Sequence, residues 1–191
     1  MAAPAQAARI LLDGEALRRT IVRIAHELLE RNPDLERTAL VGIHTRGVPF
    51  AQRLRRELEG FTGQEVALGT LDITFHRDDV HARNGTGPLH PQPVVRATRL
   101  DFPLEGMTCV LCDDVLYTGR TIRAAIDALF DYGRPERVQL AVLVDRGHRE
   151  LPIRPDYVGK NLPTSHGERV QVQLLEVDEV DRVLLVPTPE K

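Results

Sequence analysis

Short apolar runs alternate with amphipathic segments along this chain of 191 residues. Over 13–31 apolar residues recur at helical spacing, at Leu17, Ile21, Ile24 and Leu28, which predicts an amphipathic helix. The same reasoning predicts helices over 48–58 and 121–130, strands over 38–44, 66–75, 108–112 and 138–144, and late strands near 170–175 and 183–186. Apolar strands that alternate with helices indicate an α/β fold, a parallel sheet flanked by helices.

The segment 110–122 carries the most specific signal, because its period changes there from strand to helix. Asp113 and Asp114 end the strand, where two carboxylates can accept hydrogen bonds from two sugar hydroxyls. Gly119 allows close backbone approach, Thr118 and Thr121 add hydroxyl donors, and the unpaired N–H groups of a helix start suit a phosphate. Ordinary helix capping is the alternative, but capping needs only one carboxylate. The segment therefore predicts a site for a ribose 5-phosphate.

Two further polar turns follow predicted strands, at 45–47 and 145–147. Ligands of parallel sheets bind at the carboxyl ends of the strands, so these turns are expected at the same cleft. In the first turn, Thr45 precedes Arg46, whose guanidinium offers a fork of donors to phosphate oxygens. A surface turn with a solvated arginine is the alternative. In the second turn, Arg146 is a candidate for the base pocket.

The segment 76–93 shows no periodicity, and we expect a long mobile lid loop with Arg77 near its base. Tyr157 is a candidate to stack on a planar base whose edge the backbone near Val158 would read, with Val170 as a further lining residue. The alternatives are an irrelevant surface loop and a core tyrosine.

The first predicted helix has a basic face opposite its apolar stripe. Arg19, Arg23 and His26 share it, with Arg18 to one side and Arg31 near the helix end. Such a stripe can bind RNA phosphates, although from charge alone a solvated face is the better interpretation.

Composition narrows the class of protein. The net charge of −3 argues against a globally basic nucleic-acid binder. No apolar stretch reaches the roughly 18 residues of a membrane span, and the first residues do not resemble a secretory signal, so we expect a cytoplasmic protein. Cys109 and Cys112 lie in an apolar strand and are expected to be small core residues, not a redox or zinc pair.

Taken together, these motifs resemble the family of bifunctional pyrimidine-operon regulators and uracil phosphoribosyltransferases (PyrR), within the type I phosphoribosyltransferase superfamily. The resemblance covers about residues 10–181, and the segments that carry it are 17–27, 41–47, 71–79, 110–128, 139–153 and 158–161. The loop expected to hold the 5-phosphate, residues 115–121 (the phosphate loop), would alone indicate only the superfamily.

The resemblance implies that uracil and PRPP form UMP and pyrophosphate, with Mg²⁺ carried by PRPP and no protein ligand to the metal assigned. It implies that Asp113 and Asp114 bind the ribose hydroxyls and that Thr45 and Arg46 hold pyrophosphate, with Arg77 on the lid. The 5-phosphate would be held by Val115, Leu116, Tyr117, Thr118, Gly119, Arg120 and Thr121. The family also implies UMP-dependent binding to an mRNA stem-loop, which makes the basic helix face the expected RNA surface, and we expect a homodimer or larger oligomer.

We expect one domain over 10–186, with a small hood from about 150–186 and disordered tails at 1–9 and 187–191. His44 stands where the family pattern has a lysine or another long polar residue, and 81–93 matches no pattern, so no roles are assigned there. Two other functions stay open, a phosphoribosyltransferase for another base without an RNA role and a UMP sensor with little catalysis.

Overall fold

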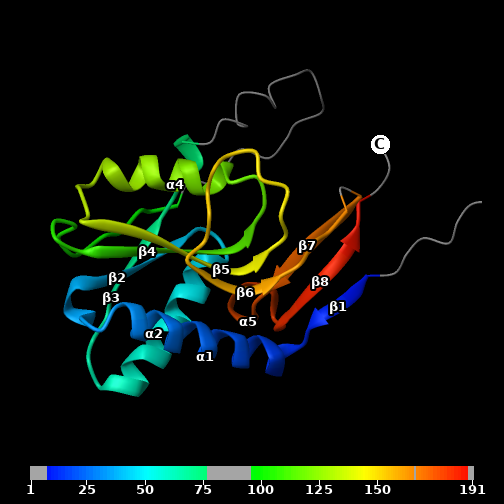
Figure 1. The fold of residues 1–191 in the computed structure, drawn as a ribbon, viewed down its shortest axis with the longest axis horizontal. Coiled ribbons are helices and arrows are strands. Elements are labelled where there is room, and N and C mark those ends of the chain that lie inside the picture. The colour runs from blue at the N-terminus through cyan, green and yellow to red at the C-terminus, as the bar shows by residue number, and fades with distance from the viewer. Residues whose placement is uncertain (1–7, 77–95, 166, 189–191) are drawn as a thin grey trace, which may run out of the picture.

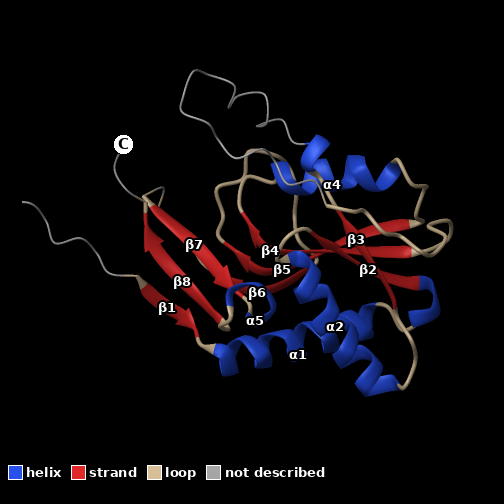
Figure 2. Ribbon diagram, turned by 180° about the vertical axis from the view of Figure 1, so that it is seen from behind, coloured by secondary structure: helices blue, strands red, loops and turns tan. Residues whose placement is uncertain are grey.

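A five-stranded parallel sheet forms the centre of the molecule, in the order β3-β2-β4-β5-β6 (Figure 1). The computed structural model describes residues 8–76, 96–165 and 167–188. The strands of this sheet are β2 (Thr38–Ile43), β3 (Ala67–Leu71), β4 (Thr108–Leu116), β5 (Arg137–Asp145) and β6 (Tyr157–Asn161). Helices α1 (Gly14–Arg31) and α2 (Gly47–Thr62) cover one face, and α4 (Arg120–Phe130) covers the other (Figure 2). The predicted α/β fold class is confirmed.

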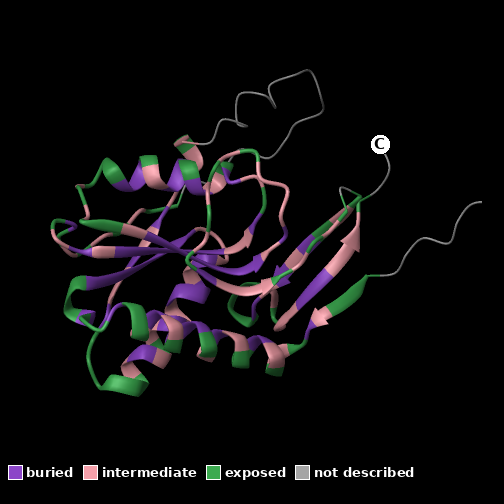
Figure 3. Ribbon diagram, in the orientation of Figure 1, coloured by how far each residue is buried: buried purple, intermediate pink, exposed green. Residues whose placement is uncertain are grey.

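The helices α1, α2 and α4 form where the apolar pattern predicts them. Helix α1 begins after Asp13, whose carboxylate accepts a hydrogen bond from the Ala16 N–H at 2.8 Å and so caps the first turn. Its stripe of Leu17, Ile21, Ile24 and Leu28 is fully packed against the sheet and α2. Apolar clusters lie on both faces of the sheet, which is why its central strands are buried along most of their length (Figure 3).

A second sheet, of three antiparallel strands, forms the hood beside the carboxyl ends of the parallel strands. Its order is β1-β8-β7, from β1 (Arg9–Leu12), β8 (Arg182–Pro187) and β7 (Glu168–Gln173), and the short helix α5 (Leu175–Asp178) connects the last two. Two expectations are corrected here. Arg9, expected in the tail, pairs with Leu185 in β1, and 157–161, expected in the hood, forms the edge strand β6 because it pairs with β5.

Two strand boundaries also differ from the predictions, each for a local reason. The strand predicted over 66–75 ends at Leu71, because the Asp72 carboxylate accepts hydrogen bonds from the N–H and hydroxyl of Thr74 and turns the chain into a 3₁₀ helix, η2 (Thr74–His76). Strand β4 continues to Leu116 because it stays paired with β5. A second 3₁₀ helix, η1 (Leu35–Arg37), precedes β2. None of the helices in the described ranges is both long and apolar enough to cross a membrane.

Candidate functional site

The two carboxylates of the motif lie where strand β4 extends beyond its neighbour β2. Strand β2 pairs with β4 only as far as Gly42 and Cys112, and β2 ends at Ile43. Strand β4 continues beside β5 alone, with Asp113 opposite Val142 and Leu116 opposite Asp145. Asp113 and Asp114 therefore lie beyond the end of β2, next to the turn that follows it. The fold creates this opening because its two adjacent parallel strands have different lengths.

The acid pair is largely buried and tied to its own backbone. The Asp113 carboxylate accepts a hydrogen bond from the Asp114 N–H at 2.9 Å, and Asp114 accepts one from the Val115 N–H at 3.0 Å. Burial raises the pKa of Asp114, while its hydrogen bonds and the positive charge of Arg46 act in the opposite direction. Nearby cations and hydroxyl donors of a sugar would favour the ionised form of such a carboxylate.

The start of α4 follows the acids and has the features that suit an anion. Gly119, with φ of 94°, leads into α4, which has no acidic residue in its first turn and no side-chain cap. The first N–H groups of a helix have no intrahelical partner, and they carry a partial positive charge. Thr118 lies in the same turn, and its carbonyl accepts hydrogen bonds from the N–H groups of Glu150 and Leu151 at 3.0 and 3.1 Å. The loop is thus fixed to the 150–151 segment by its backbone.

The turn after β2 approaches the acid pair through a glycine. A Cβ atom added at Gly47 would lie 2.1 Å from the Cys112 carbonyl oxygen and 3.3 Å from the Asp113 Cα. Only a residue without a side chain allows this contact, which brings the start of α2 against β4. Arg46 immediately precedes α2, and the His44–Thr45 peptide bond is cis. The predicted residues Thr45, Arg46, Asp113 and Asp114 are therefore brought to one place.

Arg46 is not a freely solvated surface arginine, because it is partly buried and pairs with the hood. Its Nε and Nη2 donate to the two oxygens of Asp178 at 2.9 and 2.6 Å. This pair raises the pKa of Arg46 and holds the pKa of Asp178 below its usual range. No sequence signal indicated Asp178, which belongs to no recognisable motif and lies 132 residues away.

Arg96 is a second residue that the sequence did not indicate. Its guanidinium donates to the Thr45 hydroxyl, and its N–H donates to the Asp72 carboxylate. Asp72 also accepts from Thr74, so one carboxylate connects the chain before 77 with the chain after 95. Arg77 and the expected lid loop lie outside the described residues.

The turn after β5 supports the phosphate loop. Arg149 donates to the Tyr117 carbonyl at 2.7 Å and to the Ile153 carbonyl at 3.0 Å, and it also pairs with Asp145. Arg146 stacks over the Tyr117 ring, with its Cζ 4.1 Å from the ring centroid, and donates to the Glu168 carbonyl at 2.8 Å. Arg146 thus connects the phosphate loop with the hood. Tyr117 is 37% exposed and is the aromatic residue of the phosphate loop.

The structure corrects the expected base contacts of Tyr157 and Val170. Tyr157 is 0% exposed, its ring packs in the core, and its hydroxyl is bonded to Asn32 and Gln139, so it cannot stack on a base. Val170 is buried in the same apolar cluster. Val158 is half-buried, and its carbonyl accepts a hydrogen bond from Arg23 at 3.0 Å. The core-tyrosine alternative is the correct one.

All five residues of the predicted RNA surface are exposed on α1, and most of them have partners. Arg19 pairs with Glu15 at 2.7 Å, and Arg23 pairs with Glu27 and also donates to the Gly159 carbonyl at 2.6 Å. The His26 ring stacks on Phe61, with ring centroids 4.1 Å apart, and the Arg31 Nη1 donates to the Asp156 carbonyl at 3.3 Å. The fifth residue, Arg18, is exposed as well. The face carries charges of both signs and belongs to a helix fixed to β6.

The two cysteines are core residues, as expected. Cys109 and Cys112 are buried free thiols in the core, and burial raises the pKa of Cys109 to about 11. Within the described ranges no group of three or more His, Cys, Asp or Glu side chains is placed to hold a metal ion.

Comparisons with known proteins agree with this geometry. Residues 8–177 match the model of the phosphoribosyl transferase domain. The chain is 57% identical over 175 residues to a protein of Thermus aquaticus, and 54% identical over 175 residues to one of Clostridioides difficile (strain 630), both called "Bifunctional protein PyrR". Those alignments cover 92% of this chain, and 93% and 96% of the two relatives.

Solved structures show the same fold at low sequence identity. The hypoxanthine phosphoribosyltransferase of Trypanosoma cruzi superposes with a TM-score of 0.69 at 20% identity, covering 95% of this chain and 97% of that one. The Staphylococcus aureus hypoxanthine phosphoribosyltransferase gives 0.67 at 16% identity, covering 95% and 93%. The fold of the phosphoribosyltransferases is thus shared at low identity, while the PyrR relatives share more than half of their aligned residues with this chain. The chain belongs to the phosphoribosyl transferase domain family and, within it, to the family of the bifunctional PyrR proteins.

Proposed function

We propose that this protein transfers the phosphoribosyl group of PRPP to uracil, forming UMP and pyrophosphate, and that it binds a pyrimidine-operon mRNA stem-loop when UMP is bound. The observation that carries the enzymatic half is one juxtaposition. The acid pair of β4, the uncapped start of α4 and the Thr45–Arg46 turn lie together at the carboxyl ends of β2 and β4. In chemistry, the acid pair matches the ribose hydroxyls of PRPP, the helix start matches its 5-phosphate, and the cationic turn matches its pyrophosphate.

In this reaction a bond forms between uracil N1 and the ribose C1, the bond from C1 to the pyrophosphate oxygen breaks, and the N1 proton is released. The transition state resembles an oxocarbenium ion with negative charge on the leaving pyrophosphate, so catalysis depends on positioning and on charge stabilisation. Asp113 and Asp114 hold the ribose hydroxyls, the 115–121 loop holds the 5-phosphate, and Arg46 faces the leaving group. The base contact is assigned to the end of the sheet near Tyr117 and Arg146, the exposed aromatic and its stacked cation.

Phosphoribosyltransferases generally use Mg²⁺ with PRPP, and the residues present fit a metal that arrives on the substrate. The described part of the chain offers the two acids of β4 but no cluster of three metal-ligating side chains. Mg²⁺ bound to PRPP neutralises charge on the leaving pyrophosphate. The protein's own contribution is the acid pair that orients the ribose.

An assay of UMP formation from uracil and PRPP tests the enzymatic half. Synthesis of UMP with uracil, and none with hypoxanthine, is expected. Activity only with another base would favour the phosphoribosyltransferase without an RNA role, and tight UMP binding without turnover would favour the sensor.

Electrophoretic mobility shifts with the stem-loop, with and without UMP, test the RNA half. Arg19→Glu is the informative variant, because the side chain is exposed and pairs only with Glu15 within the described structure. Each lost phosphate contact should reduce the slope of log K against log salt by roughly one unit. Arg123→Glu on α4, across the sheet, makes the same charge change as a control. Equal losses for both variants would place the RNA elsewhere. The expected oligomer and the cytoplasmic location stay predictions, and sedimentation measures the first.

A further inference from the structure

We infer that Asp178 of the hood is a positioning residue for phosphoribosyl transfer, because it holds the Arg46 guanidinium with one edge left for pyrophosphate. This inference rests on the proposed function, which assigns pyrophosphate to Arg46. It adds a residue from outside the phosphate loop and the acid pair, in a segment without a recognisable motif.

The geometry of the pair leaves part of the guanidinium available. Asp178 occupies the Nε and Nη2 edge of Arg46 in a two-point contact, at 2.9 and 2.6 Å. A guanidinium has five N–H donors in a rigid plane, and this pair uses two of them. Nη1 donates no hydrogen bond to any residue that the structure describes, so it can bind phosphate oxygens without releasing Asp178.

The pair is partly sheltered from solvent. The side chains of Arg46 and Asp178 are only 30% and 12% exposed, so solvent screens the contact less than at a free surface. Arg46 also acts on the charge of Asp114 in the acid pair. Arg46 precedes Gly47, which packs against the backbone of Asp113, and its guanidinium pairs with Asp178 of the hood, so the residue connects the acid pair's side of the site with the hood. This is where the proposed function expects the leaving group of PRPP. A flexible arginine held there in advance loses less rotamer freedom on binding.

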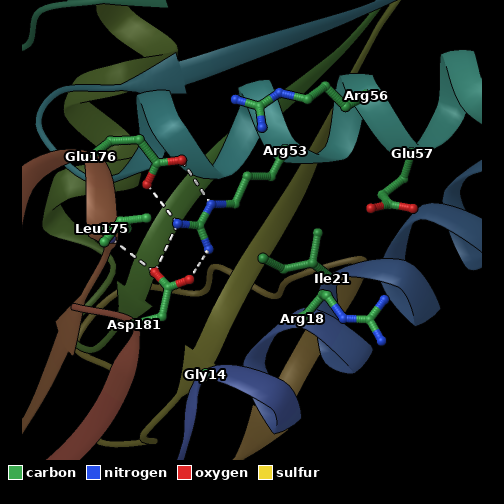
Figure 4. Close-up of a pocket in the computed structure, with 9 residues that line it drawn as sticks. All are labelled: Gly14, Arg18, Ile21, Arg53, Arg56, Glu57, Leu175, Glu176 and Asp181. Carbon is green, nitrogen blue, oxygen red and sulfur yellow. Dashed lines mark hydrogen bonds and ion pairs between the residues drawn. The ribbon is translucent and has the colours of Figure 1, made fainter. Parts of the chain in front are cut away.

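Asp178 is itself held rigidly, which a positioning residue requires. Its carboxylate also accepts the Leu174 N–H at 2.9 Å, at the start of the α5 segment. Farther along α2, Arg53 pairs with Glu176 at 2.6 Å and with Asp181 at 2.7 Å (Figure 4). Arg46, in the turn before α2, and Arg53, within α2, thus both hold the segment around α5. Of these two arginines, only Arg46 lies at the site. Glu176 therefore provides a control that weakens the attachment of the hood without touching Arg46.

The test compares Asp178→Asn with Glu176→Gln. The asparagine keeps an oxygen for the Leu174 N–H but loses the two-point contact with Arg46, because its amide group donates. We expect Asp178→Asn to raise the KM for PRPP and the Kd for pyrophosphate about tenfold, with the KM for uracil and the melting temperature close to those of the parent. Glu176→Gln should leave both pyrophosphate constants within about twofold. Asp178→Glu should restore part of the loss.

Arg46→Ala separates this inference from the proposed function. If Arg46→Ala leaves PRPP and pyrophosphate binding unchanged, the assignment of pyrophosphate to Arg46 is wrong. If Arg46→Ala weakens both and Asp178→Asn weakens neither, or strengthens them, only the positioning role is wrong. In the double variant, Asp178→Asn should add nothing to Arg46→Ala, because it acts through Arg46. Additive losses, or equal losses from Glu176→Gln, would mean that Asp178 only attaches the hood.

Discussion

The replacement Tyr157→Phe separates a structural role of this tyrosine from a role in binding the base. The ring is fully buried, and its hydroxyl accepts a hydrogen bond from the Asn32 amide at 2.9 Å and donates one to Gln139 at 3.1 Å. The substitution removes these two bonds and keeps the packed ring. Uracil binding should therefore not change, while the free energy of unfolding should fall.

The expected loss in the free energy of unfolding depends on which hydrogen bonds Asn32 and Gln139 keep in the variant. Without the hydroxyl, the Asn32 amide still donates to the Leu28 carbonyl and to Gln139, each at 3.1 Å, so no side chain in the group is left without a partner. The loss should therefore be a net loss of about 1–2 kcal/mol, without the penalty of a stranded polar group. For a chain of this length, each kcal/mol lowers Tm by about 2–4 °C. Tyr157→Ala, which also empties the ring volume, should cost about 3–5 kcal/mol.

Urea denaturation of the parent and of the two variants measures these losses, and steady-state kinetics measure the KM for uracil. We expect Tyr157→Phe to unfold earlier and to keep the parent KM. A tenfold rise in the KM for uracil with unchanged stability would refute the core assignment and return Tyr157 to the base pocket.

Three further outcomes follow from the site and the core. Asp113→Asn combined with Asp114→Asn should lower UMP synthesis by about two orders of magnitude in a protein that stays folded by circular dichroism, and parent-level activity would exclude the pair from the site. Gly47→Ala should lower Tm and raise the KM for PRPP, because the added Cβ would lie 2.1 Å from a carbonyl oxygen of β4. The control Gly60→Ala, in the same helix, adds a Cβ that meets nothing within 4 Å, so it should leave Tm unchanged or raise it. Burial raises the pKa of the Cys109 thiol to about 11, so this thiol should not react with DTNB at about pH 8 until the protein is denatured. The absorbance of the released thiolate measures the reaction, and rapid labelling of the native protein would contradict the burial of Cys109.

Much of the architecture was readable from local patterns. The four residues of the α1 stripe are all buried, and the strands predicted at 38–44 and 138–144 form near their predicted ends. The strand predicted at 108–112 begins at Thr108 as predicted but continues to Leu116. The change of period at 113–121 also predicted the start of α4, which begins at Arg120, although the acid pair lies inside β4 and not at its end. Such patterns succeed because apolar spacing reports which face of a segment is buried, and this depends only on neighbouring residues. The family resemblance added the expectation of an RNA surface on the first helix, which charge alone did not favour.

The tertiary structure decided which distant residues meet. Nothing near Tyr157 indicates that its hydroxyl lies against Asn32, since the same residues would suit a stacking aromatic. Likewise, Asp178 reaches Arg46 from 132 residues away because the hood closes over the end of the sheet. Strand β1 was missed because its partner, β8, lies at the other end of the chain. Pairing of this kind depends on the geometry of the whole fold. Local sequence patterns therefore predicted most of the helices and strands and the phosphate loop, whereas the partners of Arg46 and Tyr157 are known only from the tertiary structure.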